Sequence, residues 1–306
     1  MASHREYDPL WSHGTSAPEG VRGNAGALTG GGTHLARRIT EAVNERNPKG
    51  CLIPRRISKS VSASAVLFLL ASRRTGPSGA GEPCVLLNKR SGRVRQPGDL
   101  CFPGGRISPR LDALLARVLR WPFFPLERWP YWTEWRRLRP REGRRLALLL
   151  ATSMRESFEE MRLNPLGVRF LGPMPSQNLP MFGRVLYPMV GWIDRQRRFF
   201  PNWEVEKVVC IPLRELLDPE RYACYRLHFD ARPGDPRRGR IQDFPCFRHR
   251  GEEGEEILWG VTYRIVMAFL DIVFGFWPPP PEALPVVHGT LDGNYLYGPG
   301  GRDRGS

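Results

Sequence analysis

The segment ATSMRESFEEMRL, residues 151–163, carries three glutamates at the spacing of one helix face. Glu156, Glu159 and Glu160 stand at positions i, i+3 and i+4, which share one side of an α-helix. Carboxylates at this density repel one another unless a cation neutralises them, and their hard oxygen atoms suit Mg²⁺ or Mn²⁺. Arg155 is placed to pair with one of them. These residues alone are compatible with two interpretations, a metal site for phosphate chemistry and a solvated acidic helix face.

A pair of glycines lies upstream of this segment. In Phe102-Pro103-Gly104-Gly105 the glycines follow a proline, where the backbone turns tightly and is able to approach a ligand closely. Together, FPGG and RESFEE resemble the Nudix box, whose pattern is Gly, five residues, Glu, seven residues and then R-E-(apolar)-x-E-E-x-G-(apolar). In this match Gly105 is the box glycine, Arg155-Glu156 the Arg-Glu pair, Glu159-Glu160 the paired glutamates and Leu163 the last apolar position.

The resemblance implies a Nudix hydrolase, an α/β protein built as an α/β/α sandwich with a mixed β-sheet, which cleaves nucleoside diphosphates linked to another group. It implies Mg²⁺ or Mn²⁺ as cofactor, with Glu156, Glu159 and Glu160 as metal ligands. The expected substrate-binding residues are Arg90, Gly104, Gly105 and Arg155. The expected catalytic residues are Glu159, Glu160 and Glu204, the last because Nudix enzymes often place a metal ligand or base at the start of the strand VVCIPL.

Further segments are similar to the coenzyme A pyrophosphatase branch of this superfamily. They are LLNKRSGRVRQPGDLCFPGG (86–105), LYPMVGWID (186–194), EVEKVVCIPLRELL (204–217) and ILWGVTYRIV (257–266). This similarity implies a substrate, coenzyme A or a derivative, cut into 3′,5′-ADP and 4′-phosphopantetheine. Two alternatives stay open: another nucleotide such as ADP-ribose or a dinucleotide, and a catalytically silent Nudix fold that binds nucleotide or protein.

The box departs from the family pattern at three points. Leu111 stands where the family has an acid, and Asp112 follows it; we expect Asp112→Asn to be neutral. The stretch between Asp112 and Arg155 is far longer than the family's seven residues. Arg162 replaces the glycine that ends the helix, so we expect the stop slightly later, at Asn164-Pro165.

The extra residues form an aromatic and basic insertion over 113–145. It holds four of the nine tryptophans and nine arginines against three glutamates, a net charge of +6. Because it interrupts the loop beside the metal site, we expect a lid over the substrate, whose replacement by a Gly/Ser linker raises KM. A peripheral membrane contact, a packed subdomain and a homodimer contact are the alternatives.

The pattern of the whole sequence predicts one domain over residues 34–277. We expect a disordered leader before it (1–33) and a loose tail after it (278–306), which begins with PPPPEALP. The expected helices cover 35–44, 146–163 and 259–276. The expected strands cover 62–72, 83–89, 168–171, 184–194 and 205–211.

Composition narrows the function classes further. The net charge is +15, yet only four of the 46 basic residues are lysines, and no compact basic tract marks a nucleic-acid site. No apolar run approaches the roughly 20 residues that a membrane-spanning helix needs. The six cysteines form no CxxC pair, and we expect a reduced, cytoplasmic protein.

Overall fold

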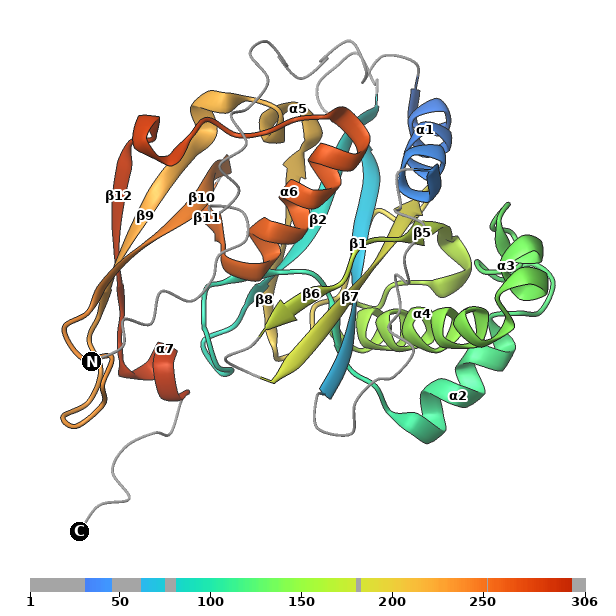
Figure 1. Cartoon of the computed structure of the whole chain (residues 1–306), viewed down its shortest axis with the longest axis horizontal. Coiled ribbons are helices and arrows are strands. Elements are labelled where there is room, and N and C mark those ends of the chain that lie inside the picture. Colours follow the sequence, from blue (N-terminus) through green and yellow to red (C-terminus); the bar gives the residue numbers. More distant parts are fainter. Residues whose placement is uncertain (1–30, 46–61, 75–80, 180–182, 252, 299–306) are drawn as a thin grey trace.

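The computed structural model describes residues 31–45, 62–74, 81–179, 183–251 and 253–298 (Figure 1). Its larger sheet has the order β3-β2-β1-β7-β5, with β8 beside β2, β4 beside β1 and β6 beside β7. The strands are β1 (Ser62–Arg74), β2 (Gly81–Arg90), β3 (Leu100–Cys101), β4 (Gly104–Arg106), β5 (Val168–Pro173), β6 (Gln177–Leu179), β7 (Arg184–Ile193) and β8 (Val205–Pro212). The central pair β1 and β7 is parallel and β2 runs antiparallel to β1, so the sheet is mixed.

Strand β1 shows how the sheet separates two apolar cores. Successive side chains of a strand point to opposite faces, and β1 is apolar without interruption from Ala65 to Ala71. Leu67 and Leu69 pack into the core under helix α4, whereas Phe68 and Leu70 pack into the core under helices α1 and α6. Helices therefore cover both faces of the sheet (Figure 1). The predicted α/β/α sandwich with a mixed sheet is confirmed.

The helices range from one turn to six. They are α1 (Gly31–Glu45), α2 (Pro109–Val118), α3 (Trp132–Leu138), α4 (Pro140–Met161), α5 (Leu213–Leu216), α6 (Gly260–Phe274) and α7 (Gly293–Tyr297), with short 3₁₀ turns at Pro165–Gly167, Pro219–Arg221 and Pro281–Ala283. Among the described helices, none is both long and apolar enough to cross a bilayer.

A second sheet corrects the prediction of a loose tail from residue 278. Strands β9 (Tyr222–Phe229), β10 (Ile241–Gly251), β11 (Gly254–Trp259) and β12 (Val286–Leu291) have the order β11-β10-β9-β12. Helix α6 ends at a left-handed Gly275, and after the prolines β12 pairs in parallel with β9, so residues 278–298 belong to the folded unit. The leader up to residue 30 and the last residues from 299 lie outside the described part.

The insertion is a packed extension of the α4 side, so the prediction of a lid is wrong. Trp129 and Trp132 are each only 2% exposed and share the core of Leu67 and Leu69. The indole Nε1 of Trp129 also donates to Leu171 O at 3.1 Å. Trp132 packs over Gly143, which precedes Glu156 by about 20 Å along α4 at 1.5 Å per residue. Figure 1 accordingly shows α3 at the end of α4 that is remote from the glutamates.

Candidate active site

The two glycines bring the backbone against the glutamates of α4. Strand β4 pairs antiparallel with β1, and Gly104 has a φ of +158°, a conformation that side-chain-bearing residues rarely adopt. A Cβ at Gly104 would overlap the backbone of Ala65 and Val66, and a Cβ at Gly105 would overlap the carboxylate of Glu156. Gly104 therefore requires glycine, whereas a side chain at Gly105 would displace the Glu156 carboxylate from its present position.

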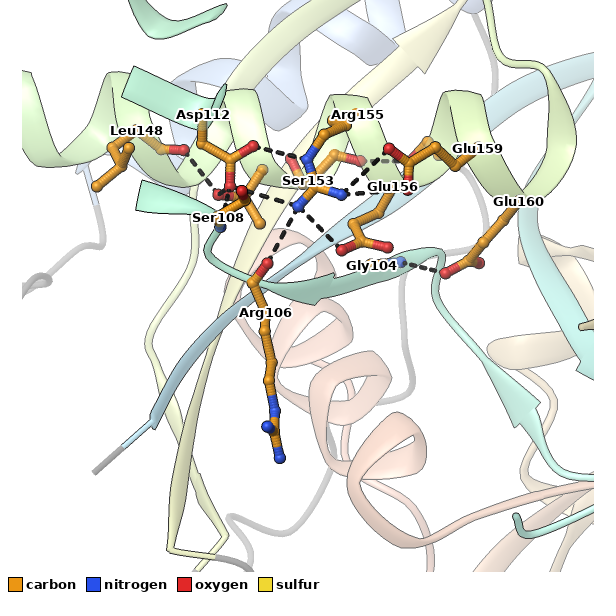
Figure 2. A network of polar contacts seen from close by, with 12 residues as sticks. Gly104, Arg106, Ser108, Asp112, Leu148, Ser153, Arg155, Glu156, Glu159 and Glu160 are labelled. Atoms are coloured by element: carbon orange, nitrogen blue, oxygen red, sulfur yellow. Dashed lines mark hydrogen bonds and ion pairs between the residues drawn. The ribbon is translucent and has the colours of Figure 1, made fainter. Parts of the chain in front are cut away.

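Arg155 connects the carboxylates around it (Figure 2). Its guanidinium contacts Asp112 at 2.7 Å, Glu156 at 3.0 Å and Glu159 at 3.1 Å, and it donates to the carbonyl of Arg106 at 3.1 Å. Burial opposes the charge of Arg155, but the hydrogen bond to Asp112 and the charge of Glu156 outweigh it and raise the pKa of the guanidinium. Arg155 thus fixes the relative positions of α4, α2 and the strand after the glycines.

Asp112 is completely buried, and its contacts do not support the expected neutrality of Asp112→Asn. Its Oδ2 accepts from Ser108 N at 2.7 Å and from the Thr152 hydroxyl at 2.8 Å, while Oδ1 accepts from Arg155 Nε. An asparagine keeps the shape but leaves the Arg155 charge without its closest partner. Asp112 therefore lies at the site as the partner of Arg155, although it stands one position later in the sequence than the acid of the family pattern.

Glu160 is the most deeply buried of the three glutamates. Its carboxylate accepts from Asn88 Nδ2 at 2.7 Å and from Gly104 N at 3.3 Å. Burial is the main cause that raises its pKa, to about 7, although these two donors act in the opposite direction and Glu204 adds repulsion. A carboxyl group with a pKa near neutrality is suited to exchange protons or to bind a cation.

Asn88 is a site residue that the sequence analysis missed. It lies on β2, is 1% exposed, and its Oδ1 is buried without a hydrogen-bond partner. Cys84 and Leu86 share its face of the strand and pack toward α4. A polar residue at an inward position of an apolar strand was the signal that pointed to it.

Arg155 pairs with two of the three predicted metal ligands, whereas the third, Glu160, accepts from Asn88 and Gly104. In the described part of the chain, no group of three His, Cys, Asp or Glu side chains is arranged to hold a metal ion. Glu156 and Glu159 both pair with Arg155, and Glu159 is about half exposed. Burial raises the pKa of Glu156 as well, so two buried carboxylates lie beside the glycines.

Arg90 is the last residue of β2, and Glu204 directly precedes β8, the strand that pairs with β2. Ser91 N donates to Glu204 O at 2.8 Å, and Asn202 N donates to Glu160 O at 2.8 Å. The charge of Glu204 contributes to the raised pKa of Glu160, so the two carboxylates are neighbours. Arg90 Nε donates to Arg95 O at 2.8 Å, which orders the loop.

Helix α4 ends earlier than we expected. Arg162 takes the left-handed conformation, with a φ of 55°, at the position where the family has glycine. Its N–H donates to Phe158 O, the bond of an αL cap, and Leu163 N donates to Ser157 O at 3.3 Å. The expected stop at Asn164-Pro165 is therefore wrong, because the cap forms at Arg162 despite its Cβ.

Comparisons with known proteins give matches in three-dimensional structure. No model of a known protein family matches the chain, and no curated protein matches it by sequence. A Nudix hydrolase from M. smegmatis is similar at 13% identity and a TM-score of 0.33, over 51% of this chain and 73% of that one. An Ap4A hydrolase from C. elegans is similar at 13% identity and a TM-score of 0.31, over 51% of this chain and 84% of that one. A NUDIX hydrolase from Nitrosomonas europaea is similar at 12% identity and a TM-score of 0.34, over 76% of this chain and 81% of that one. At such identities and TM-scores, the functional conclusion rests on the side chains of this chain.

Proposed function

We propose that the chain is a Nudix pyrophosphohydrolase that uses Mg²⁺ or Mn²⁺. The observation that carries this proposal is the contact between two distant motifs: Gly104 N donates to Glu160 at 3.3 Å, and Gly105 lies against Glu156. The resemblance to the Nudix box assigns Gly105, Glu156 and Glu160 to one and the same motif. A solvated acidic helix face, the other interpretation of the sequence, does not bury Glu160 or pair Arg155 with Asp112.

The carboxylate donors at this site have the chemistry that a divalent cation needs, although Arg155 pairs with two of them in this arrangement. Burial raises the pKa of Glu160 and of Glu156, so both carboxylates carry charge that the protein neutralises incompletely. Glu156, Glu159 and Glu160 are the residues that would hold the ion, through the hard oxygen atoms that Mg²⁺ and Mn²⁺ prefer. When bound, the ion supplies charge neutralisation to the diphosphate and makes a water molecule more acidic.

The protein's own groups account for the remaining needs of the reaction. Hydrolysis adds water across a phosphoanhydride, and the attacking water must lose a proton to a base. Glu160, with its pKa of about 7, and its neighbour Glu204 are the candidate bases. Arg155 holds Glu156 and Glu159 in place, while the Gly104-Gly105 backbone gives a phosphate close access. Arg90, at the start of the neighbouring loop, is the candidate for binding the substrate's phosphates.

Coenzyme A or a derivative is the substrate we propose, cut into 3′,5′-ADP and 4′-phosphopantetheine. Support comes from the segments that resemble the coenzyme A branch, which form β2, the loop to Gly105, β7, β8 and the start of α6. ADP-ribose and dinucleotides are the alternative substrates. A cytoplasmic location is part of the proposal, supported by the free thiols of the five described cysteines.

The deciding experiment is a substrate panel with matched variants. Coenzyme A, ADP-ribose and a diadenosine polyphosphate are incubated with Mg²⁺, Mn²⁺ or EDTA, and the phosphate products are identified. We expect Glu160→Gln and Glu204→Gln to lose about 100-fold or more in kcat, whereas Glu253→Gln, a side chain that is 74% exposed, behaves as wild type. Nucleotide binding without turnover of any substrate would favour the silent binding module instead.

A further inference from the structure

The insertion buries two tryptophans and presents other large apolar side chains to solvent. Leu114, within α2, is 57% exposed, and Trp121 and Phe123, in the segment after α2, are 61% and 82% exposed. Phe123 also has a φ of 74°, which costs a side-chain-bearing residue about 1 kcal/mol. The fold therefore holds an aromatic ring outward at a conformational cost.

The exposed residues form a stripe on α2. Leu111, Leu114, Val118 and Trp121 follow one another at spacings of three and four, which places them on one side of a helix. The helical hydrogen bonding continues to the end of the stripe, since Trp121 N donates to Val118 O at 2.9 Å. The buried side chains of α2 and its cap, Asp112, Ala116 and Leu119, point elsewhere. We call Leu111, Leu114, Val118, Trp121 and Phe123 the α2 stripe.

Two exposed arginines, Arg117 and Arg120, lie within or directly after α2, beside the α2 stripe. Within residues 113–145, which the structure describes in full, eight arginines are exposed: Arg117, Arg120, Arg128, Arg136, Arg137, Arg139, Arg141 and Arg144. Glu134 is the one exposed acidic residue of the same range. The insertion therefore combines outward Leu, Trp and Phe with a strong excess of positive charge.

We infer that the α2 stripe docks on the surface of an anionic phospholipid bilayer. Exposed Leu, Trp and Phe on and directly after an amphipathic helix, with Arg117 and Arg120 between them in the sequence, are a composition that inserts into the boundary between headgroups and acyl chains. Each basic residue near an anionic leaflet adds attraction. The inference stands on the insertion alone and does not depend on the proposed hydrolase activity.

Two other occupants fit the same surface less well. In a twofold dimer through the α2 stripe, Arg117 and Arg120 of one copy would lie close to the same arginines of the other. Nucleic acid would use the arginines and aromatic rings, but it gives no role to Leu111 and Leu114, which are 45% and 57% exposed. Acyl chains provide an apolar environment for leucine, tryptophan and phenylalanine together.

The test is co-sedimentation with vesicles of phosphatidylcholine, with and without phosphatidylserine. We expect the full chain to bind the anionic vesicles at least about tenfold more tightly than the neutral ones, and to lose most of this preference in high salt. The double variant Trp121→Ser/Phe123→Ser should lose binding about tenfold or more. Arg117→Gln/Arg120→Gln should lose a similar factor on anionic vesicles.

Matched controls separate this surface from general stickiness and general charge. Trp277→Ser removes a tryptophan that is 53% exposed outside the insertion, and Arg195→Gln/Arg197→Gln removes two exposed arginines there; both should bind as wild type. All substituted side chains are exposed, so unchanged thermal unfolding confirms that the variants fold. Three results would each overturn the inference: no binding of wild type to anionic vesicles, equal binding by the tryptophan-phenylalanine variant, or a dimer or RNA complex in solution that this variant abolishes.

Discussion

Asp112 and Arg155 are 43 residues apart in the sequence, yet Arg155 Nε lies 2.7 Å from Asp112 Oδ1. The contact is possible because α2 packs along α4 in the folded chain. Asp112 lies in the first turn of α2 and Arg155 near the end of α4. The insertion joins the opposite ends of these two helices, and so it lengthens the pair without separating the residues at the site.

The buried pair predicts a large effect for Asp112→Asn. Removing one partner of a buried ion pair leaves the other charge uncompensated, at a cost of about 3 kcal/mol in unfolding free energy. Because Arg155 positions Glu156 and Glu159, kcat should also fall by about 10–100-fold. Urea unfolding and steady-state kinetics measure the two effects.

A matched control for this substitution is Asp194→Asn. Asp194 pairs with Arg169 at the same distance of 2.7 Å, but the two side chains are 44% and 34% exposed. An exposed pair contributes at most about 1 kcal/mol, so this variant should be nearly as stable as wild type and fully active. Equal stability losses in the two variants would show that burial does not determine the strength of the Asp112 pair.

The sequence predicted the parts of the fold that depend on local patterns. Apolar runs located β1, β2 and β7, and the carboxylate spacing located the functional end of α4. The helix begins at Pro140, six residues before the predicted start, because proline is tolerated in a first turn. Strand β12 could not be predicted, since it depends on parallel pairing with β9, about sixty residues earlier in the chain.

The same distinction applies to the site. The motif identified Arg155 and the glutamates, whereas Asn88 and Asp112 gain their roles only from contacts across the sheet and between helices. The lid was predicted from composition, and composition alone does not distinguish a buried tryptophan from an exposed one. In the structure Trp129 is 2% exposed and Trp121 is 61% exposed within one insertion.

Asp99 predicts a pH dependence of stability. Burial raises the pKa of this carboxyl to about 6, against the opposing hydrogen bonds from Tyr295 at 2.6 Å and Trp259 at 3.0 Å. The folded state therefore keeps a proton that the unfolded state has already lost between about pH 4 and pH 6. Stability should fall as the pH rises through this window, by at most about 3 kcal/mol, and the penalty is complete above it.

Two variants test the Asp99 prediction by urea unfolding across the same pH range. In Asp99→Asn the loss of stability between about pH 4 and pH 6 should largely disappear. Tyr295→Phe removes a donor that stabilises the charged carboxylate, so the loss should extend to higher pH. Parallel profiles for wild type and Asp99→Asn would contradict the assignment.

Arg162 predicts a stabilising substitution. Its left-handed backbone costs about 1 kcal/mol with a Cβ and nothing with glycine, so Arg162→Gly should relieve that strain. The variant also loses the contact of the guanidinium with the Phe158 ring at 5.1 Å, about 0.5 kcal/mol at an exposed position. Arg162→Ala loses the same contact and keeps the strain. In thermal unfolding, the glycine variant should exceed the alanine variant by about 1 kcal/mol; equal stabilities would contradict the strain.

For the insertion we predict an effect on stability, in place of the rise in KM that the lid hypothesis predicted for its replacement by a Gly/Ser linker. Trp129 packs 5.1 Å from the ring of Phe170 and donates to Leu171 O, so Trp129→Ala should cost about 4 kcal/mol of unfolding free energy. Trp121→Ala removes the same side chain from an exposed position and should cost less than about 0.5 kcal/mol. Replacing residues 113–144 with a Gly/Ser linker would uncover the core on the α4 side, so we expect loss of the cooperative unfolding transition. A linker variant that unfolds like wild type and changes KM alone would restore the lid.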